Sequence, residues 1–166
     1  LVPWVVDADG QVLVGHLARP NPQWMSRTLG EALVVCGGPN AYVSPSWYAT
    51  KAEHGRVVPT WDYLTLQLFG TLIVHDDPGW VENAVRRLTD HHEATRDDPW
   101  SVDDAPRDYI NGQLLGIVGI EFQVRRVEAS LKMSQNRSPQ DVDGVVAGLI
   151  ADGRPEVAEL VRQAAT

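Results

Sequence analysis

The chain has 166 residues, of which 43% are hydrophobic and 22% are charged, and its formal net charge is −8. That length and apolar content suffice for one domain with its own core, which we predict over residues 1–166. The acidic balance argues against nucleic-acid binding, because such proteins cluster basic residues on one surface. The single cysteine, Cys36, excludes an internal disulfide framework.

Membrane and export signals are absent from the sequence. No apolar run approaches the ~20 residues that a membrane-spanning helix needs, and no signal peptide is present. We therefore expect a soluble protein of the cytoplasm.

The first half of the chain carries patterns typical of β-strands. Residues 1–7 and 11–19 flank the turn signal "ADG", which predicts a hairpin. Asn21-Pro22 predicts the start of a short helix that ends near Gly30. Three more strands are expected, at 31–37 and 41–45 on either side of "GPN", and at 56–75 with a bend or bulge at Gly70.

The second half alternates helices with one long strand. We expect helices from Asp77-Pro78 to about Asp90, from Asp104 to Leu115, from Ser138 and from about Pro155, and a strand within 116–133. Ser138, Pro139 and Asp141 form a helix-start signal of cap, first-turn proline and third-position acid. About six strands with peripheral helices predict a small closed or partly closed antiparallel barrel.

The common catalytic motifs are missing. The glycines match neither phosphate-binding loop, and no GxSxG elbow is present. The pair His91-His92 is expected at a helix end, where adjacent residues point in different directions, so we do not predict a metal site there.

Polar and aromatic side chains gather near the predicted strand ends. The candidates are His16, Arg19 and Asn21 in the first segment, Ser44, Ser46, Trp47, Tyr48, Lys51 and His54 in the second, Thr60, Trp61 and Asp62 in the third, and Lys132, Ser134, Gln135, Asn136 and Arg137 in the fourth. Each group has an ordinary explanation as core aromatics, loop residues or helix caps. Together they offer the cations, hydroxyls and flat rings that a large planar anion needs.

These same segments resemble a known family. "GHLARPNPQW", "AYVSPSWYATKAEHGRVVPTWDY", "GIVGIEF" and "KMSQNRSPQDVDGVVAGL" look like the PaiB family of FMN-binding split-barrel proteins. The resemblance implies a mainly β split barrel with peripheral α-helices, related to pyridoxamine-phosphate oxidases. It also implies a homodimer with cofactor clefts at the subunit interface, and an N-terminal helix and strand that this chain lacks.

The resemblance leaves two cofactors open. Most of the family is associated with FMN and negative transcriptional regulation. A branch, the piperazate synthases of natural-product biosynthesis, uses haem b to form an N–N bond by dehydrative cyclisation of N5-hydroxy-L-ornithine to L-piperazic acid. The chain departs from the common pattern at Asn40 and Gln67, and at Asp62, where "VPTWDY" replaces "VPTWNY".

Our leading prediction is the haem enzyme. His16 would hold the haem iron, with His54 as the next choice, because imidazole suits haem iron. Tyr48, Lys51 and His54 are the predicted catalytic residues, with Tyr48 and Lys51 as proton donors to a hydroxylated amino acid substrate. The cofactor-binding set would be His16, Arg19, Asn21, Ser44, Trp47, Thr60, Trp61, Lys132, Gln135, Asn136 and Arg137.

Two alternatives remain. In the first, the chain is an FMN protein, either a regulator or a flavin oxidoreductase, with the phosphate near His16, Arg19, Asn21 or the 132–137 segment and the ring against Trp47 or Trp61. No helix-turn-helix with a basic face is visible, so we expect no nucleic-acid partner. In the second, the fold is a ligand-binding or interaction module without turnover.

Overall fold

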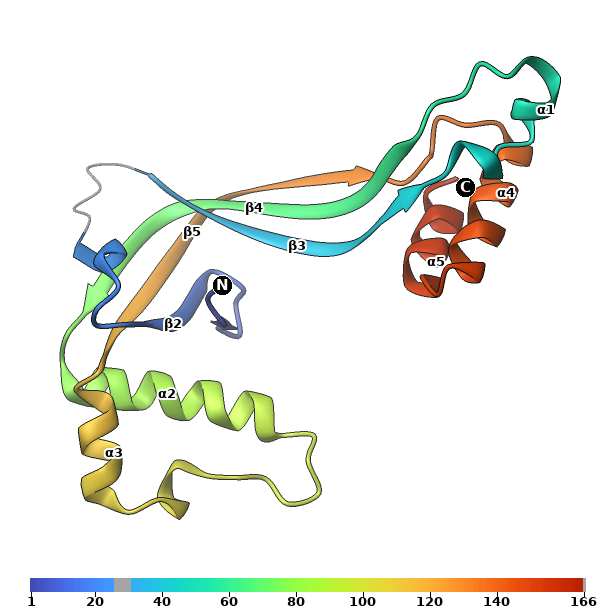
Figure 1. Ribbon diagram of the computed structural model, residues 1–166. Coiled ribbons are helices and arrows are strands. Elements are labelled where there is room, and N and C mark those ends of the chain that lie inside the picture. The colour runs from blue at the N-terminus through green and yellow to red at the C-terminus, as the bar shows by residue number, and fades with distance from the viewer. Residues whose placement is uncertain (26–30, 166) are drawn as a thin grey trace. The chain divides into compact units, whose positions relative to one another are not determined.

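The computed structural model describes residues 1–25 and 31–165 of the chain. The chain forms two compact units, and the long strands contribute to both of them (Figure 1). Unit 1 comprises Leu1–Leu33 and Leu68–Arg126, and unit 2 comprises Val34–Gln67 and Val127–Thr166. Each unit has its own helices and its own packed residues.

The described strands form one five-stranded sheet in the order β1-β2-β5-β4-β3. Their bounds are β1 Val5–Val6, β2 Val12–Ala18, β3 Ala32–Val43, β4 Thr60–His75 and β5 Ile117–Lys132. The predicted hairpin is confirmed, since β1 and β2 pair antiparallel with Val5 opposite Val14 and Gly10 has a φ of +72° in the turn. Strand β2 also pairs antiparallel with β5, which places His16 opposite Gly119.

The strand residues predicted on either side of "GPN" are largely confirmed, but the break between them is wrong, because β3 is one strand that runs through Gly38, Pro39 and Asn40 without a turn. Strand β3 lies at the edge of the sheet. An edge strand tolerates proline, which has no N–H to donate to a neighbour. A Cβ on Gly38 would lie 3.1 Å from the Leu64 carbonyl oxygen, so the glycine permits close packing there.

The predicted helices of the second half are confirmed. The helices described are α1 Thr50–His54, α2 Pro78–Glu93, α3 Arg107–Leu114, α4 Pro139–Ala151 and α5 Pro155–Ala164. Helix α1 was not predicted, and its short length leaves little periodic signal. Short 3-10 helices occur at Pro22–Met25, Pro45–Trp47 and Val102–Asp104. The helix predicted from Asn21 is seen only as the first of these, and residues 26–30 lie outside the described residues.

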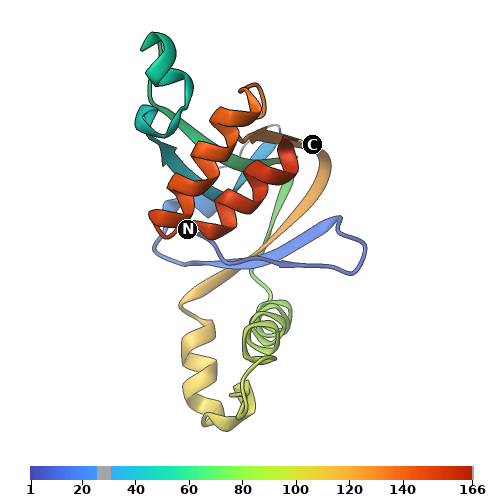
Figure 2. The ribbon, with the colours of Figure 1, turned by 90° about the vertical axis from the view of Figure 1, so that its right-hand side faces the viewer.

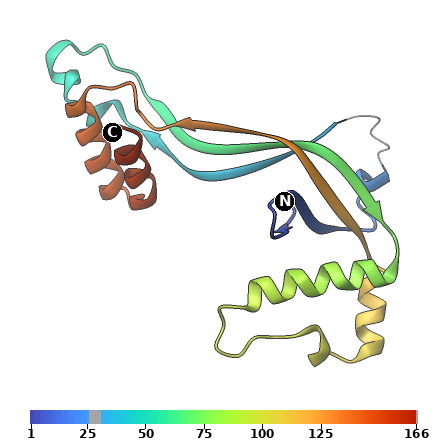
Figure 3. The same cartoon turned by 180° about the vertical axis from the view of Figure 1, so that it is seen from behind.

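Unit 1 packs its sheet against helix α2, with α3 beside that helix (Figure 3). Leu17, Val118 and Ile120 form its buried apolar cluster. Two glycines allow close approach, because a Cβ on Gly70 would lie 2.0 Å from the Gln123 carbonyl oxygen and one on Gly119 would lie 2.2 Å from the Trp80 ring. We predicted a bend or bulge at Gly70, and the reason for a glycine there is this contact.

Unit 2 places α4 and α5 side by side, as Figure 2 shows. Their apolar faces, with Val145, Leu149 and Val157, join Val43, Tyr48 and Met133 in one core. Gly144 and Gly148 of α4 contact Trp47, and a Cβ on Gly148 would lie 2.2 Å from the indole ring. Trp47 therefore packs against a helix, as expected of a core aromatic.

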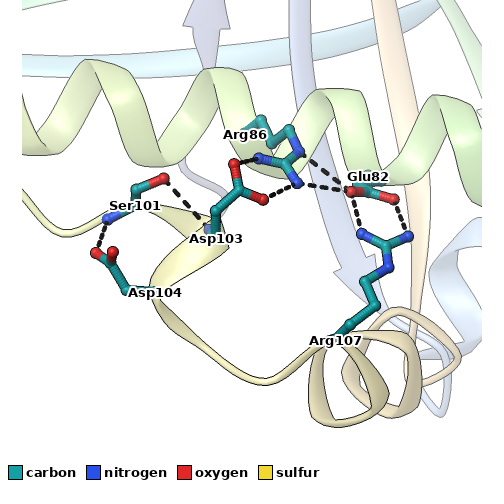
Figure 4. Close-up of polar contacts among 6 residues, drawn as sticks. All are labelled: Glu82, Arg86, Ser101, Asp103, Asp104 and Arg107. Carbon is teal, nitrogen blue, oxygen red and sulfur yellow. Dashed lines mark hydrogen bonds and ion pairs between the residues drawn. The ribbon is translucent and has the colours of Figure 1, made fainter.

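A network of ion pairs joins α2 to the start of α3 and to the 3-10 helix before it (Figure 4). Glu82 accepts from both guanidinium groups nearby, at 2.5 and 2.6 Å from Arg107 and 2.9 Å from Arg86. Arg86 also donates to Asp103 at 2.6 and 3.0 Å. The hydrogen bonds from Arg107 and Arg86 lower the pKa of Glu82 from 4.5 to about 2.

The described helices include none that is both long and apolar enough to cross a bilayer. The described residues also include no group of three or more His, Cys, Asp or Glu side chains that could hold a metal ion. His91 and His92 lie in the last turn of α2, with ring centroids 5.1 Å apart.

We predict that Glu82→Gln lowers the free energy of unfolding at neutral pH by about 1 kcal/mol. The free energy of unfolding of the variant should also fall less on acidification than that of the wild type. Because the folded pKa of Glu82 is lowered, its contribution is complete above pH 4.5 and is lost as the pH falls through about 2. Urea unfolding from pH 6 to 2 measures this. The difference between wild type and variant should shrink on acidification, whereas a constant difference would contradict the prediction. Asp90→Asn, an exposed carboxylate on the same helix, is the control.

Candidate functional site

The polar residues of unit 2 converge on a buried carboxylate, Asp62, which is 0% exposed. The Ser134 hydroxyl donates to Asp62 Oδ2 at 2.7 Å. Asp62 Oδ1 has no hydrogen-bond partner among the described residues, and Lys132 Nζ lies 4.0 Å from it. We call Tyr48, Asp62, Lys132, Ser134 and Arg137 the Asp62 cluster.

Lys132 ties the end of β5 to the start of β4. Its Nζ donates to the Thr60 hydroxyl oxygen and, at 2.7 Å, to the Trp61 carbonyl oxygen. An ammonium group has three N–H donors, and a hydroxyl that accepts one bond keeps its own hydrogen. The Lys132 side chain is 45% exposed, and among the described residues no hydrogen bond uses its third N–H or the O–H of Thr60.

The turn after β5 is held by its own side chains. Ser134 has a φ of +54°, in the left-handed region that few non-glycine residues adopt. Gln135 braces the turn, since its Oε1 accepts from Met133 N at 2.7 Å and its Nε2 donates to Leu131 O at 2.9 Å. Gln135 is thus occupied within the turn, and Asn136 beside it is exposed.

Arg137 covers the buried Tyr48. Its guanidinium carbon lies 4.5 Å from the centre of the Tyr48 ring, a cation–π contact. Tyr48 is 3% exposed, its hydroxyl has no hydrogen-bond partner of ordinary geometry among the described residues, and burial raises its pKa. The cluster therefore holds two buried polar atoms, Tyr48 Oη and Asp62 Oδ1, whose hydrogen-bonding capacity is unused.

The remaining predicted residues of unit 2 stabilise local turns. Ser44 caps the 3-10 helix Pro45–Trp47 by accepting from Ser46 N at 3.2 Å. Lys51 donates to the Ser46 hydroxyl at 3.1 Å, and His54 Nδ1 accepts from Arg56 N at 3.0 Å. Thr50 donates through its amide and its hydroxyl to the Asp141 carboxylate, which links α1 to α4.

The predicted residues of unit 1 do not form a common cluster. Arg19 donates to protein acceptors: Asp76 at 2.5 Å, Ile117 O at 3.0 Å and Leu115 O at 2.8 Å. Asn21 caps the first 3-10 helix by accepting from Gln23 N at 2.9 Å. His16 is different, because its buried Nδ1 has no hydrogen-bond partner among the described residues and burial lowers its pKa.

Trp61 belongs to a separate hollow in unit 2. Side chains alternate along a strand, so Trp61 points away from Thr60 and Asp62. Its ring is 51% exposed and borders a hollow of about 450 Å³. The other lining residues are Pro39, Asn40, Ala41, Tyr42, Leu149, Asp152, Arg154 and Glu156. Of these, sequence reasoning singled out only Asn40; the exposed position of Tyr42 in the alternating "AYV" was the available signal.

Comparisons with known proteins agree with this fold. A family model described as "Putative FMN-binding domain" matches residues 1–126. An uncharacterized protein of Emericella nidulans is 32% identical over 200 residues, covering 98% of this chain and 80% of that protein. The protease synthase and sporulation protein PAI 2 of Bacillus subtilis is 31% identical over 153 residues, covering 92% of this chain and 71% of that protein.

Among solved structures, the flavocytochrome Anf3 of Azotobacter vinelandii is similar, with a TM-score of 0.52 and 8% identity. The likeness covers 79% of this chain and 54% of that one, so the chain spans about half of the flavocytochrome. At this identity the likeness concerns the fold alone. Together with the five-stranded sheet and its helices, it confirms the predicted fold class, mainly β and of the split-barrel type.

We predict that Asp62→Asn changes the pH dependence of stability. Burial is the main cause that raises the pKa of Asp62, against the lowering effects of Ser134 and Lys132. A raised folded pKa means that the native carboxyl holds its proton more tightly, so its stabilising contribution is lost as the pH rises through that pKa. Asn keeps the acceptor for Ser134 without the charge.

Urea unfolding between pH 4 and 8 measures the effect. The free energy of unfolding of Asp62→Asn relative to wild type should rise with pH, and Asp62→Ala should be about 1–2 kcal/mol less stable because Ser134 loses its acceptor. A free energy of unfolding of Asp62→Asn that falls relative to wild type as the pH rises would contradict the raised pKa of Asp62.

Proposed function

We propose that this chain, which belongs to the PaiB-like family of FMN-binding proteins, binds FMN and serves a flavin-dependent redox reaction. The observation that carries the proposal is the pair of donors left open at Lys132 and Thr60. A phosphate is recognised by an ammonium charge together with hydroxyl and amide donors. We assign the FMN phosphate to this pair.

The charges around Lys132 favour this assignment. Lys132 Nζ lies 4.0 Å from Asp62 Oδ1, which is too far for a hydrogen bond. Burial raises the pKa of Asp62 and so opposes its charged form, while Ser134 and Lys132 act in the other direction. Arg137 adds a second positive charge close enough to act on Asp62. An anion at Lys132 thus meets positive charge that the protein itself only partly neutralises.

The bound flavin would supply electron or hydride transfer, and the chain would position it. Lys132 and Thr60 would fix the phosphate end, because both are held in place by hydrogen bonds across two strands. The Ser134 turn would keep Lys132 at that position, since Ser134 is anchored on the buried Asp62. The substrate of the reaction is not indicated by these residues.

The homodimer expected from the family resemblance stays a prediction. Exposed apolar side chains on the strands of unit 2, namely Val35, Leu66, Val127 and Leu131, offer surface for a second copy to bury. Such a partner would also contribute walls to a cofactor site.

A second candidate is the haem-dependent cyclisation of N5-hydroxy-L-ornithine, and His16 is the observation that favours it. Its Nδ1 is not committed to a structural hydrogen bond among the described residues. Burial lowers the pKa of His16, which favours the neutral imidazole that ligates iron. The family match supports FMN instead, so this candidate depends on that histidine alone.

We predict that Lys132→Met weakens FMN binding about tenfold or more, which corresponds to the loss of one charge-assisted contact. Fluorescence titration of FMN, whose emission changes on binding, measures it. Arg162→Gln is the control, because it removes one positive charge from an exposed pair on α5. Equal FMN affinity in wild type and Lys132→Met would remove Lys132 from the phosphate site.

The absorption spectrum of protein expressed with FMN and a haem precursor both available separates the two candidates. We expect the two broad absorption bands of oxidised flavin, and we expect these bands to be the same with and without the haem precursor. A sharp Soret band that disappears in His16→Ala would establish the haem candidate and overturn the FMN proposal.

A further inference from the structure

We propose that the hollow bordered by Trp61 binds a small zwitterion, a molecule that carries an alkylammonium group and a carboxylate on a short apolar chain. This is a second ligand site, distinct from the FMN phosphate site assigned to Lys132 and Thr60. All of its lining residues belong to unit 2. A hollow of about 450 Å³ falls in the size range of small-molecule sites.

Two aromatic rings form an exposed corner in this hollow. Trp61 and Tyr42 are 51% and 47% exposed, and their ring centroids are 6.3 Å apart at an interplanar angle of 63°. Two large aromatics exposed side by side on one surface are typical of binding sites. The faces of such rings attract organic cations.

The tryptophan is fixed in place before any ligand arrives. Its Nε1 donates to Asn40 Oδ1 at 3.1 Å, and Asn40 Nδ2 donates to the Gly38 carbonyl oxygen at 3.1 Å. Both the oxygen and the nitrogen of the Asn40 amide therefore take part in hydrogen bonds that orient the Trp61 ring. A ring that is already oriented loses little conformational entropy when a ligand binds to it.

The backbone that carries the charged residues of the hollow is also fixed. Helix α4 ends in a Schellman motif, in which Gly153 has a φ of +71°, Gly153 N donates to Ile150 O at 3.1 Å and Arg154 N donates to Leu149 O at 2.8 Å. This motif sets the backbone positions of Asp152 and Arg154, and Glu156 follows in the first turn of α5. These three side chains form no ion pair with one another in the described structure.

The chemistry of the lining selects the ligand. Two carboxylates and two aromatic faces suit an ammonium group, which gains from both charge and cation–π contact. The single guanidinium of Arg154 suits a carboxylate. The buried apolar residues Ala41 and Leu149 line the space between and suit a short chain of methylene groups. A plain anion would face net negative charge and is disfavoured.

Isothermal titration calorimetry of the full chain with three six-carbon probes tests the proposed zwitterion site. The probes are 6-aminohexanoate, hexylammonium and hexanoate. We expect 6-aminohexanoate to bind most tightly, hexylammonium more weakly, and hexanoate not measurably. Glu156→Gln and Asp152→Asn should each weaken 6-aminohexanoate and hexylammonium about fivefold, and Arg154→Gln should weaken 6-aminohexanoate alone by a similar factor.

The matched control is Glu159→Gln, an exposed carboxylate of α5 outside the hollow, which should bind all probes as wild type does. Trp61→Leu should abolish the binding of 6-aminohexanoate. If this variant folds poorly, Glu156→Gln, Asp152→Asn and Arg154→Gln still test the site, because they change exposed side chains. Hexanoate binding as tightly as hexylammonium, or unchanged binding in Glu156→Gln and Asp152→Asn, would overturn the proposal. The affinity of Glu156→Gln and Arg154→Gln for FMN is measured separately. The zwitterion proposal and the FMN proposal can therefore be rejected independently of each other.

Discussion

The contact of Lys132 with the start of β4 is the interaction on which both the architecture and the proposed function depend. One ammonium group binds the Thr60 hydroxyl and the Trp61 carbonyl oxygen, and it lies near the buried Asp62. The contact closes the end of β5 onto β4 across 72 residues of sequence. It also leaves positive charge at a half-exposed position. A structural tie that retains free donors is a natural place for an anion to bind.

The polar residues of unit 2 fall into two groups, one buried and one about half exposed to solvent. Asp62 and Tyr48 are buried with unused hydrogen-bonding atoms, a state that costs free energy unless a water, a proton or a ligand compensates. Lys132 and Trp61 are about half exposed and meet solvent on opposite sides of β4. This separation explains why the sequence clusters do not combine into one site, and why the proposed phosphate site and the aromatic hollow share no side chains.

Local signals in the sequence predicted local structure well. Ser138 does cap α4, and its hydroxyl accepts from Asp141 N at 3.2 Å. The "GPN" segment falsely predicts a turn because glycine, proline and asparagine usually mark turns, whereas an edge strand accommodates all three. The long-range contacts could not be predicted, since nothing local to Thr50 indicates Asp141 and nothing local to Arg19 indicates Asp76. The resemblance identified the family, while only the geometry showed that Arg19 binds Asp76 and two carbonyl oxygens and that Lys132 binds Thr60 and Trp61.

The proposal that Lys132 and Thr60 hold the phosphate of FMN can be tested with two ligands. Riboflavin is FMN without its phosphate, so comparing the affinities of the two ligands for the wild-type chain isolates that group. We predict that FMN binds at least about tenfold more tightly than riboflavin, and that the preference decreases as salt screens the lysine charge. Equal affinities for FMN and riboflavin at low salt would contradict it, because the phosphate would then contribute nothing to binding.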